Sequence, residues 1–291
     1  MQDIGRGLKR LLSRGMGWDL SRAAIEPLAG GITNRNYRLD IGAGSYVLRV
    51  GSRGAEKLGI SRRREYRCSL IAARSGIGPE VIGFFPGSRL LITRFVPGRQ
   101  VSQAKAAQGA FLRRIAASLR RLHDGPSFPG FFSPFEAVRR CHRLARERHV
   151  PLPPALNAAL AAMGRIEKAL APFPRRPCHN DLLSGNLIDD GRTLSILDWE
   201  YAAMGDPFFD LGNFAANQNL SPESCRTLLR AYGGTFDRGW DRLQLYRLAS
   251  DLRESLWGFA QAGISRLDFN FLAYAGKYLS RFLKKQGEGR P

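Results

Sequence analysis

Hydrophobic and polar positions alternate along much of the first hundred residues, as they do in half-buried β-strands. The alternation covers residues 22–29, 36–50, 80–85 and 89–96. Glycines interrupt it at Gly30-Gly31 and again around residue 43. These turns between short alternating runs predict antiparallel β structure.

The rest of the chain has the spacing of amphipathic helices. Helical periodicity covers 61–75, 104–122, 134–148 and 154–170. The first of these helices is expected to start at a serine and stop at a glycine. Two short strands are expected around 186–189 and 194–198, followed by helices to the last residues. The change of pattern at Pro97-Gly98 places a lobe boundary near residues 97–102.

Composition bounds the class of protein. The chain has 291 residues, 44% of them apolar and 24% charged, which excludes a disordered or collagen-like chain. Its four cysteines form no C-x-x-C pair, and no apolar run is long enough for a membrane-spanning helix. The first residues lack the apolar core of a secretory signal, so we expect a cytoplasmic protein with reduced thiols.

The net charge of +20 indicates an anionic ligand, although arginines on a solvated surface would explain the total equally well. Residues 180–270 differ from this background, with 13 acidic and 8 basic side chains, while the other 200 residues carry a net +25. An acidic segment in a basic chain indicates a cationic ligand on one side and an anionic ligand on the other.

One segment, residues 178–200, has the residue types that phosphoryl transfer requires. Asp181 lies five positions before Asn186, and Asp198 follows twelve positions later at the end of an apolar run. A carboxylate is needed to orient or deprotonate the attacking hydroxyl, and hard oxygen ligands are needed to hold magnesium. With His179 the segment matches the H-x-D-x-x-x-x-N spacing of the kinase catalytic loop, and Asp198-Trp199-Glu200 stands where protein kinases have DFG.

These motifs resemble the choline/ethanolamine kinase family, within the aminoglycoside phosphotransferase-like, protein-kinase-like folds. The resemblance covers roughly residues 25–285. It is carried by GGITNRNYRL at 30–39, YVLRV at 46–50, LLITRFVPGR at 90–99, CHNDLLSGN at 178–186 and LDWEYAAMGDPFFDLGNF at 197–214. It implies an α+β, two-lobed fold. Residues 1–98 would form a small β-rich nucleotide-binding lobe, and residues 99–291 a larger, mainly helical lobe for catalysis and acceptor binding.

The resemblance also assigns roles to individual residues. Asp181, Asn186 and Asp198 would be catalytic, with Asn186 and Asp198 holding Mg²⁺. Asp210 would brace the catalytic loop by accepting backbone hydrogen bonds, whereas Asp206 is expected only to begin a helix.

ATP would bind in the small lobe and between the lobes. The turn at Gly30-Gly31 lets backbone amides and short polar side chains approach phosphate oxygens. Arg49 stands where kinases carry a phosphate-binding lysine, and an arginine there favours the choline kinase branch. The predicted cofactor-binding residues are Gly31, Thr33, Asn34, Arg49, Glu65, Thr93 and Phe95. An unliganded hairpin, an exposed strand arginine and an ordinary edge strand remain the alternatives.

The acceptor is predicted to be a compact cation. Glu254, Trp257 and Gln261 are spaced to share one helix face, and aromatic faces beside a carboxylate bind quaternary ammonium groups. The predicted substrate-binding residues are Glu200, Tyr201, Glu254, Trp257, Gln261 and Tyr274, with Tyr278 adjacent. The alternative is that the aromatic residues belong to the core and Glu254 is a solvated helix charge.

We therefore expect an ATP- and Mg²⁺-dependent kinase for choline or a similar amino alcohol such as ethanolamine. Thiamine and aminoglycosides are alternative acceptors. A non-catalytic protein on a kinase fold, or an adaptor for nucleic acid or an anionic membrane, is the alternative from another class. The complete set of Asp181, Asn186 and Asp198 argues against it. The cluster Arg62-Arg63-Arg64 with Arg67 is expected to be either an anion-binding patch or a solvated face.

Overall fold

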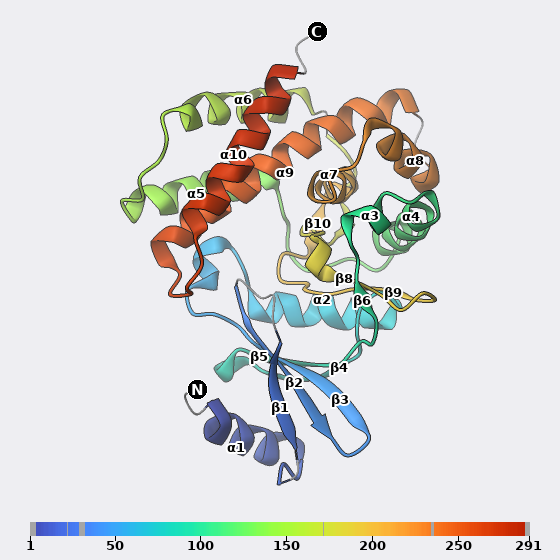
Figure 1. Cartoon of the computed structure of the whole chain (residues 1–291), viewed down its shortest axis with the longest axis vertical. Helices are drawn as coiled ribbons and strands as arrows, with labels where there is room; N and C mark the ends of the chain where they lie inside the picture. The colour runs from blue at the N-terminus through green and yellow to red at the C-terminus, as the bar shows by residue number, and fades with distance from the viewer. Residues whose placement is uncertain (1–3, 22, 29–32, 171, 234–235, 289–291) are drawn as a thin grey trace.

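The computed structural model describes residues 4–21, 23–28, 33–170, 172–233 and 236–288. Figure 1 shows a small β-rich lobe that carries the N-terminus and a larger helical lobe that carries the C-terminus. The fold is therefore α+β and two-lobed, as predicted, and we draw the division after strand β5. The small lobe contains α1 (Ile4–Met16), β1 (Ala24–Leu28), β2 (Arg35–Ile41), β3 (Gly44–Val50), η1 (Ala55–Leu58), α2 (Arg62–Arg74), β4 (Val81–Phe85), η2 (Pro86–Ser88) and β5 (Leu90–Arg94).

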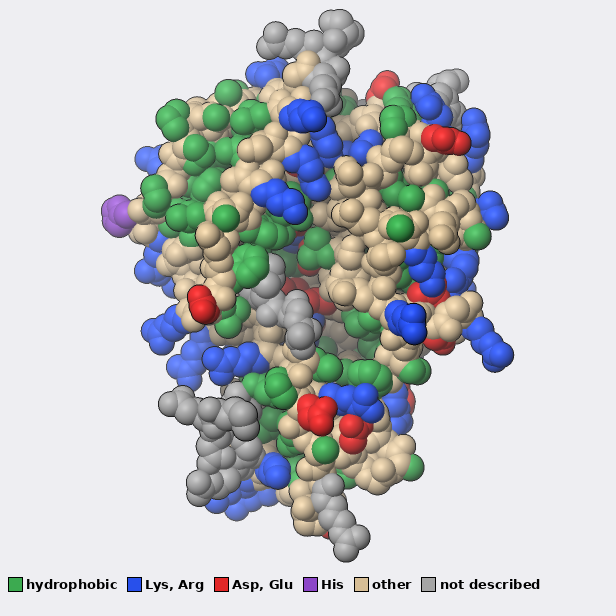
Figure 2. All heavy atoms as spheres, in the orientation of Figure 1, with side chains coloured by type: hydrophobic (Ala, Val, Ile, Leu, Met, Phe, Trp, Pro, Cys, Tyr) green, Lys and Arg blue, Asp and Glu red, His purple; other side chains and the backbone are tan. Residues whose placement is uncertain are grey.

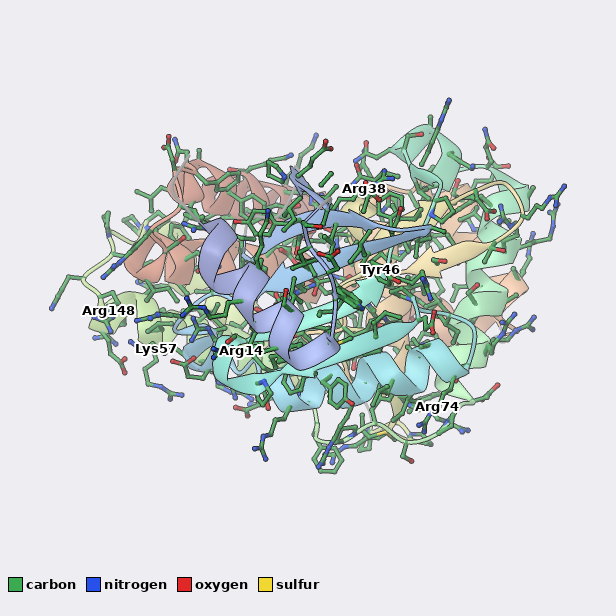
Figure 3. All side chains as sticks on the ribbon, turned by 90° about the horizontal axis from the view of Figure 1, so that it is seen from below. Arg14, Arg38, Tyr46, Lys57, Arg74 and Arg148 are labelled. Atoms are coloured by element: carbon green, nitrogen blue, oxygen red, sulfur yellow. The ribbon has the colours of Figure 1, made fainter. Side chains whose placement is uncertain are left out.

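The small lobe is built on one antiparallel sheet with strand order β1-β2-β3-β5-β4. The predicted strands are confirmed within a few residues of their ends, while the Gly30-Gly31 turn lies outside the described residues. Amphipathic helix α1 covers one face of this sheet (Figure 3) and packs Leu12 against a cluster that includes Leu39, Leu48 and Ile92. The sheet is thus rigidly backed on the side of α1.

Helix α2 links the two lobes. Ser61 caps its first turn by accepting a hydrogen bond from the Arg64 amide, as the serine in the sequence predicted. Its buried residues Cys68 and Ala72 belong to the same apolar cluster as Trp199 of the larger lobe. The polar groups on α2 are therefore fixed relative to the larger lobe.

The larger lobe is mainly helical. Its elements are β6 (Arg99–Gln100), α3 (Gln103–Ala106), α4 (Gly109–His123), α5 (Pro134–Glu147), α6 (Ala155–Ala169), β7 (Arg176–Cys178), η3 (Ser184–Asn186), β8 (Leu187–Asp189), β9 (Leu194–Ile196), β10 (Ala203–Gly205), α7 (Pro207–Asn217), α8 (Pro222–Tyr232), α9 (Phe236–Ile264) and α10 (Phe271–Glu288). Short strands pair as β10-β7 and as β6-β8-β9. No helix of the described residues is both long and apolar enough to cross a membrane.

The single helix predicted over 104–122 is wrong, because the chain breaks into α3 and α4. Gln108 has an extended backbone (φ −71°, ψ 133°) and Gly109 begins the second helix. The short first helix is capped by Ser102, and its Lys105 forms an ion pair with buried Asp189 at 2.7 Å. A tertiary contact thus overrides the continuous helical propensity of the alanine-rich segment.

Helix α9 runs through the centre of the larger lobe and packs against α5, α7 and α10. Residues 249–261 of this helix are all buried. Gly258 allows α10 to approach closely, since a Cβ atom there would lie 3.0 Å from Ala275 Cβ and 3.0 Å from Tyr274 Cδ1. The polar side chains of this stretch are therefore held between neighbouring helices.

Candidate active site

The segment His179-Asn180-Asp181 forms a loop between β7 and η3, and a buried carboxylate braces it. Asp210 accepts hydrogen bonds from the backbone amides of His179 (2.8 Å) and Asn180 (2.6 Å). The predicted bracing contacts of Asp210 are confirmed. Asp206 accepts a hydrogen bond from the Phe208 amide at the start of α7, so its predicted place as a helix-capping residue is confirmed as well.

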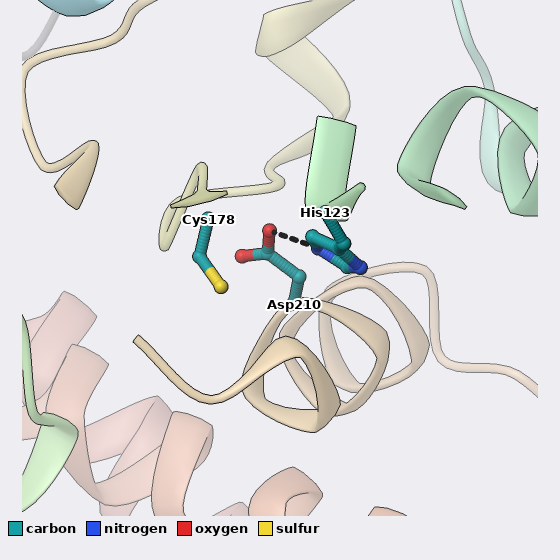
Figure 4. Close-up of side chains that lie close together, drawn as sticks. All are labelled: His123, Cys178 and Asp210. Carbon is teal, nitrogen blue, oxygen red and sulfur yellow. Dashed lines mark hydrogen bonds and ion pairs between the residues drawn. The ribbon is translucent and has the colours of Figure 1, made fainter. Parts of the chain in front are cut away.

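Figure 4 shows Asp210 close to His123 and Cys178. His123 Nε2 lies 3.1 Å from Asp210 Oδ2, and His123 Nδ1 lies 2.6 Å from the Tyr232 hydroxyl. Burial raises the pKa of the Cys178 thiol, which keeps it protonated. Because both oxygens of Asp210 already accept hydrogen bonds, we assign this cluster a structural role rather than metal binding.

His179 orients the loop as a neutral imidazole. Its Nδ1 accepts a hydrogen bond from the Asp181 amide at 3.2 Å, so the ring proton lies on Nε2, which donates to the Leu197 carbonyl at 2.9 Å. Burial lowers the pKa of His179, in agreement with this neutral form. Asn180, which lies between His179 and Asp181, has a left-handed backbone (φ 67°). Its side-chain amide donates a hydrogen bond to the Tyr201 carbonyl. The loop is thus fixed on both sides of Asp181.

Asp181 is a buried carboxylate with a cationic partner that the sequence analysis did not identify. Its Oδ1 accepts a hydrogen bond from the Arg253 guanidinium at 2.9 Å. Burial raises the pKa of Asp181 to about 7, although Arg253 opposes this rise and Glu254 adds to it. A carboxylate with a pKa near neutrality is suited to accept a proton from a hydroxyl group.

Asn186 and Asp198 lie on adjacent segments, next to Asp181. The Asn186 side-chain amide donates to the Asp181 carbonyl at 2.8 Å, and the Leu197 amide donates to the Asn186 carbonyl at 2.8 Å. Asp198 follows directly, with a left-handed backbone (φ 66°) that directs the chain out of β9. The structure therefore brings the three predicted catalytic residues together.

An ion cluster joins the small lobe to Asp198 and Glu200 of the larger lobe. Arg49 Nη2 lies 2.5 Å from Asp198 Oδ1 and 2.8 Å from Glu200 Oε2, and its Nε lies 3.1 Å from Glu65 Oε1. Burial alone would raise the pKa of Asp198, but the neighbouring cations Arg49 and Arg62 act in the opposite direction and the pKa is lowered. Arg49 and Glu65 are therefore paired, as their predicted positions on strand and helix require.

Arg62 belongs to the same cluster, so its prediction as part of an anion patch or a solvated face was wrong. Its guanidinium binds Glu65 Oε2 at 2.7 Å, Glu200 Oε2 at 3.0 Å and Asn34 Oδ1 at 2.8 Å. The reason is its position on the first turn of α2, beside β3, where only 12% of its side chain is exposed. Arg63 and Arg67 on the same helix are exposed.

Glu200 was predicted to bind the acceptor, but among the described residues its hydrogen-bond and ion-pair partners all belong to the small lobe. Glu200 Oε2 accepts hydrogen bonds from the guanidinium groups of Arg49 and Arg62 and from the Asn34 side-chain amide, the last at 2.9 Å. Burial raises the pKa of Glu200, with a further contribution from Asp198. Its acceptor role stays a prediction, while its contacts place it with the residues predicted for nucleotide binding.

The donor set fits a magnesium ion. Asp198 offers carboxylate oxygens and Asn186 an amide oxygen, which are the hard ligands that Mg²⁺ prefers. Carboxylate oxygens of Glu65, Asp198 and Glu200 lie within 4.8 Å of one another. Three carboxyl groups share two guanidinium groups here, so a bound cation would balance the charge of the cluster when all three are ionised. Figure 2 shows acidic side chains at the bottom of the hollow between the lobes.

The remaining predicted nucleotide-binding residues are Thr93, Phe95, Thr33 and Gly31. Thr93 pairs with Val47 within the sheet, and the Phe95 amide donates to the Ser45 carbonyl at 2.9 Å. Thr33 is half-buried and lies two residues before β2, whereas Gly31 lies outside the described residues. Adenine binding by residues 92–96 stays a prediction.

The predicted acceptor side chains of α9 meet Tyr274 of α10. The Tyr274 hydroxyl donates to Glu254 Oε2 at 2.8 Å, and the Trp257 ring packs edge-on against Tyr274 with centroids 5.6 Å apart. Glu254 is 2% exposed, so it is no solvated helix charge. Gln261, one turn further along α9, is buried too.

Arg253 connects these groups to the catalytic loop. Its Nη1 binds both Asp181 and Glu254, and the guanidinium lies over the Tyr201 ring, 4.4 Å from the centroid. One face of Tyr201 is therefore already covered by a cation, and its predicted contact with the acceptor stays untested. The signal in the sequence that could have pointed to Arg253 is the presence of charged residues among the apolar residues of α9. Charged side chains on a buried helix must pair with one another.

Comparison with known proteins places this arrangement in a family. A model of the phosphotransferase enzyme family (APH) matches residues 24–246. The chain belongs to this phosphotransferase family. Protein LicA from Haemophilus influenzae is 27% identical over 271 residues, which cover 83% of this chain and 77% of LicA.

Two solved structures share the fold of this phosphotransferase. A choline/ethanolamine kinase family protein from Mesorhizobium loti is 28% identical, with a TM-score of 0.82 over 98% of this chain and 95% of the other. Choline kinase LicA from Streptococcus pneumoniae is 22% identical, with a TM-score of 0.83 over 97% and 99% of the two chains. The predicted resemblance to choline/ethanolamine kinases and the predicted phosphotransferase activity toward an alcohol are thereby confirmed.

Proposed function

We propose that this phosphotransferase moves the γ-phosphoryl group of ATP, with Mg²⁺, to the hydroxyl group of choline, ethanolamine or a similar small amino alcohol. The observation that carries the proposal is the chain of contacts Asp181–Arg253–Glu254–Tyr274. It joins the candidate base to a carboxylate and aromatic rings, the groups that recognise an ammonium ion.

In this proposal Asp181 orients the hydroxyl and takes its proton. Arg253 engages Oδ1 of Asp181, so Oδ2 is the oxygen that receives the proton as the new oxygen–phosphorus bond forms and the bond to ADP breaks. Magnesium supplies neutralisation of phosphate charge when it is bound by Asn186 and Asp198. Arg49 supplies a further cation at the same place, since it lies 2.5 Å from Asp198.

Named relatives support the nucleotide and the acceptor class. A structure of LicA in complex with AMP has a TM-score of 0.81 over 99% of both chains, at 22% identity. A human choline/ethanolamine kinase is 23% identical over 91% of this chain. Both observations are consistent with an adenine nucleotide and a small cationic alcohol as the two substrates.

The experiment is ADP release from Mg-ATP with choline, ethanolamine, thiamine and an aminoglycoside offered separately. We expect choline or ethanolamine to exceed the other acceptors at least about tenfold in kcat/KM, since the acceptor groups are compact and share one carboxylate. A preference for thiamine or the aminoglycoside would overturn the acceptor class. Bound ATP without turnover on any of the four would overturn the proposal as a whole.

A further inference from the structure

A cavity of about 840 Å³ lies between the lobes, outside the catalytic groups described above. The small lobe contributes Thr33, Arg35, Arg89 and residues 50–58, which run from the end of β3 through η1. The larger lobe contributes Arg148 at the end of α5 and residues of the 261–267 segment at the end of α9. We call it the cationic cavity.

The lining of the cationic cavity has one sign of charge. Its cations are Arg35, Arg53, Lys57, Arg89, Arg148 and Arg266, against the single carboxylate of Glu56. Arg89 donates to the Gly51 carbonyl at 3.1 Å. In the part of the chain that the structure describes, the side chains of the other five cations form no ion pair or hydrogen bond.

Some exposed arginines elsewhere on the surface have acidic partners, whereas others, such as Arg63 and Arg74, have none among the described residues. Arg38 pairs with Asp40 at 2.9 Å, and Arg94 pairs with Glu80 at 3.1 Å. Five of the six cations are exposed to solvent, and like charges gathered around one concave surface repel one another and focus a positive potential into the cavity. Such a wall is stabilised by an anion that contacts several of its cations at once.

Backbone packing holds the cationic wall in place. Gly263 allows the end of α9 to lie close to Arg148 at the end of α5, because a Cβ atom at position 263 would lie 2.6 Å from Arg148 Cβ. Across the cavity, the buried side chains of Ala55 and Leu58 anchor η1 in the core. Figure 3 shows Lys57 and Arg148 near one another at the same edge of the molecule, and Figure 2 shows Lys and Arg side chains gathered at the edge between the lobes.

The cavity borders both predicted substrate sites. Gln261 lies in its wall and follows Trp257 by one turn of α9, about 6 Å along the helix axis. Thr33 lies in the opposite wall, next to Asn34 of the ion cluster. We propose that the cationic cavity binds an anionic group, a phosphate or a carboxylate, beside the acceptor site. The anion is carried either by the acceptor itself or by a separate molecule, and the first source rests on the proposed function.

The test is calorimetric titration of inorganic pyrophosphate into the full chain, with and without saturating ADP. One variant carries Lys57→Ala, Arg148→Ala and Arg266→Ala. A matched control carries Arg63→Ala, Arg74→Ala and Arg192→Ala, three exposed arginines outside the cavity that remove the same charge. Melting temperatures of all three proteins verify that each one is folded.

We expect pyrophosphate to bind the parent protein in the presence of ADP and to weaken with added salt. The cavity variant should bind it about 10- to 100-fold more weakly, while the control variant stays within about threefold of the parent. Equal weakening in both variants would overturn the proposal, since it would show a general charge effect. Binding that ADP abolishes and the cavity variant leaves unchanged would also overturn it.

A second pair of titrations identifies the source of the anion. Choline and carnitine share a quaternary ammonium and a hydroxyl group, but only carnitine adds a carboxylate. Tighter binding of carnitine by the parent, lost in the cavity variant and kept in the control, would assign the anion to the acceptor. Equal binding of the two, with the pyrophosphate results as expected, would assign it to a separate molecule. Both readouts measure binding, so they remain interpretable even if none of the tested alcohols is phosphorylated.

Discussion

At the scale of single residues, the protonation of Asp181 depends on neighbours with opposite effects. Burial is the largest influence and raises the pKa of Asp181 to about 7, and Glu254 acts in the same direction. Arg253, whose Nη1 lies 2.9 Å from Asp181 Oδ1, opposes them. Arg253 is therefore a positioning residue that also sets the pH range in which Asp181 can accept a proton.

Replacing Arg253 by Gln should move the acidic limb of the kcat/KM profile to higher pH by about 1 to 3 units. Asp181 acts as a base only when it is deprotonated. Loss of the neighbouring cation favours its protonated form, so a higher pH is needed to recover the active carboxylate. The measurement is kcat/KM for the best acceptor between pH 5 and 9.

Arg253→Lys is the matched variant, because it keeps the charge while losing the planar fork of donors. We expect its acidic limb to stay within about one unit of that of the parent. A purely structural role would lower kcat/KM without moving the limb. An Arg253→Gln profile with an unshifted limb would therefore contradict the role we assign to this residue.

At the scale of elements, the acceptor groups depend on how closely α9 and α10 approach. Gly258 stands at this contact, and Tyr274 on α10 supplies the hydroxyl that donates to Glu254. A larger side chain at Gly258 would push Tyr274 away from both Glu254 and Trp257. The ion cluster around Arg49 lies on other elements and would keep its geometry.

Gly258→Val should therefore raise the acceptor KM about tenfold and leave the nucleotide KM within about twofold. Overpacking should also lower the free energy of unfolding by about 1 to 3 kcal/mol. Gly276→Val on α10 is the control, because no atom lies within 4 Å of a Cβ at that position. Equal effects of the two substitutions on the acceptor KM would contradict this account of the helix contact.

Element types were predictable where the periodicity is local. The five strands of the small-lobe sheet and the serine-capped α2 follow from alternation and capping, which neighbouring residues determine. Strands β6, β7 and β10 were missed, because each has only two or three residues and is defined by a partner distant in the sequence. The break between α3 and α4 was missed for a similar reason, namely the Lys105–Asp189 ion pair.

The candidate site was predictable where the motif is contiguous. Asp181, Asn186 and Asp198 are spaced by one loop and one hairpin, so the sequence places them together. Arg253 is 72 residues away from Asp181, and only the packing of α9 brings it into contact. Arg62 was misassigned because a run of arginines predicts neither which one is buried nor its partners in the fold.

At the scale of the whole molecule, the two lobes meet through a buried ion cluster. Glu200 Oε2 of the larger lobe accepts hydrogen bonds from Arg49, Arg62 and Asn34 of the small lobe. A buried carboxylate with three donors fixes the relative position of these groups. This cluster, rather than the acceptor groups of α9, is therefore expected to respond to a change at Glu200.

Glu200→Gln should raise the nucleotide KM about tenfold and leave the acceptor KM within about twofold. We also expect the free energy of unfolding to fall by about 2 kcal/mol, because two buried guanidinium groups lose part of their compensation. Glu80→Gln, which removes the carboxylate of an exposed ion pair with Arg94, should change neither constant. A selective rise in the acceptor KM would instead support the acceptor role that the sequence suggested for Glu200.

In the proposed reaction Asp181 activates a hydroxyl group for transfer of the ATP γ-phosphoryl group. The most direct measurement is transfer of labelled γ-phosphate to choline and ethanolamine by the parent, by Asp181→Asn and by Asp190→Asn, an exposed control on the turn between β8 and β9. We predict a turnover about 100- to 10,000-fold lower for Asp181→Asn, with ATP binding retained and the control equal to the parent. An Asp181→Asn protein that transfers phosphate at a rate within a few-fold of the parent would contradict the account.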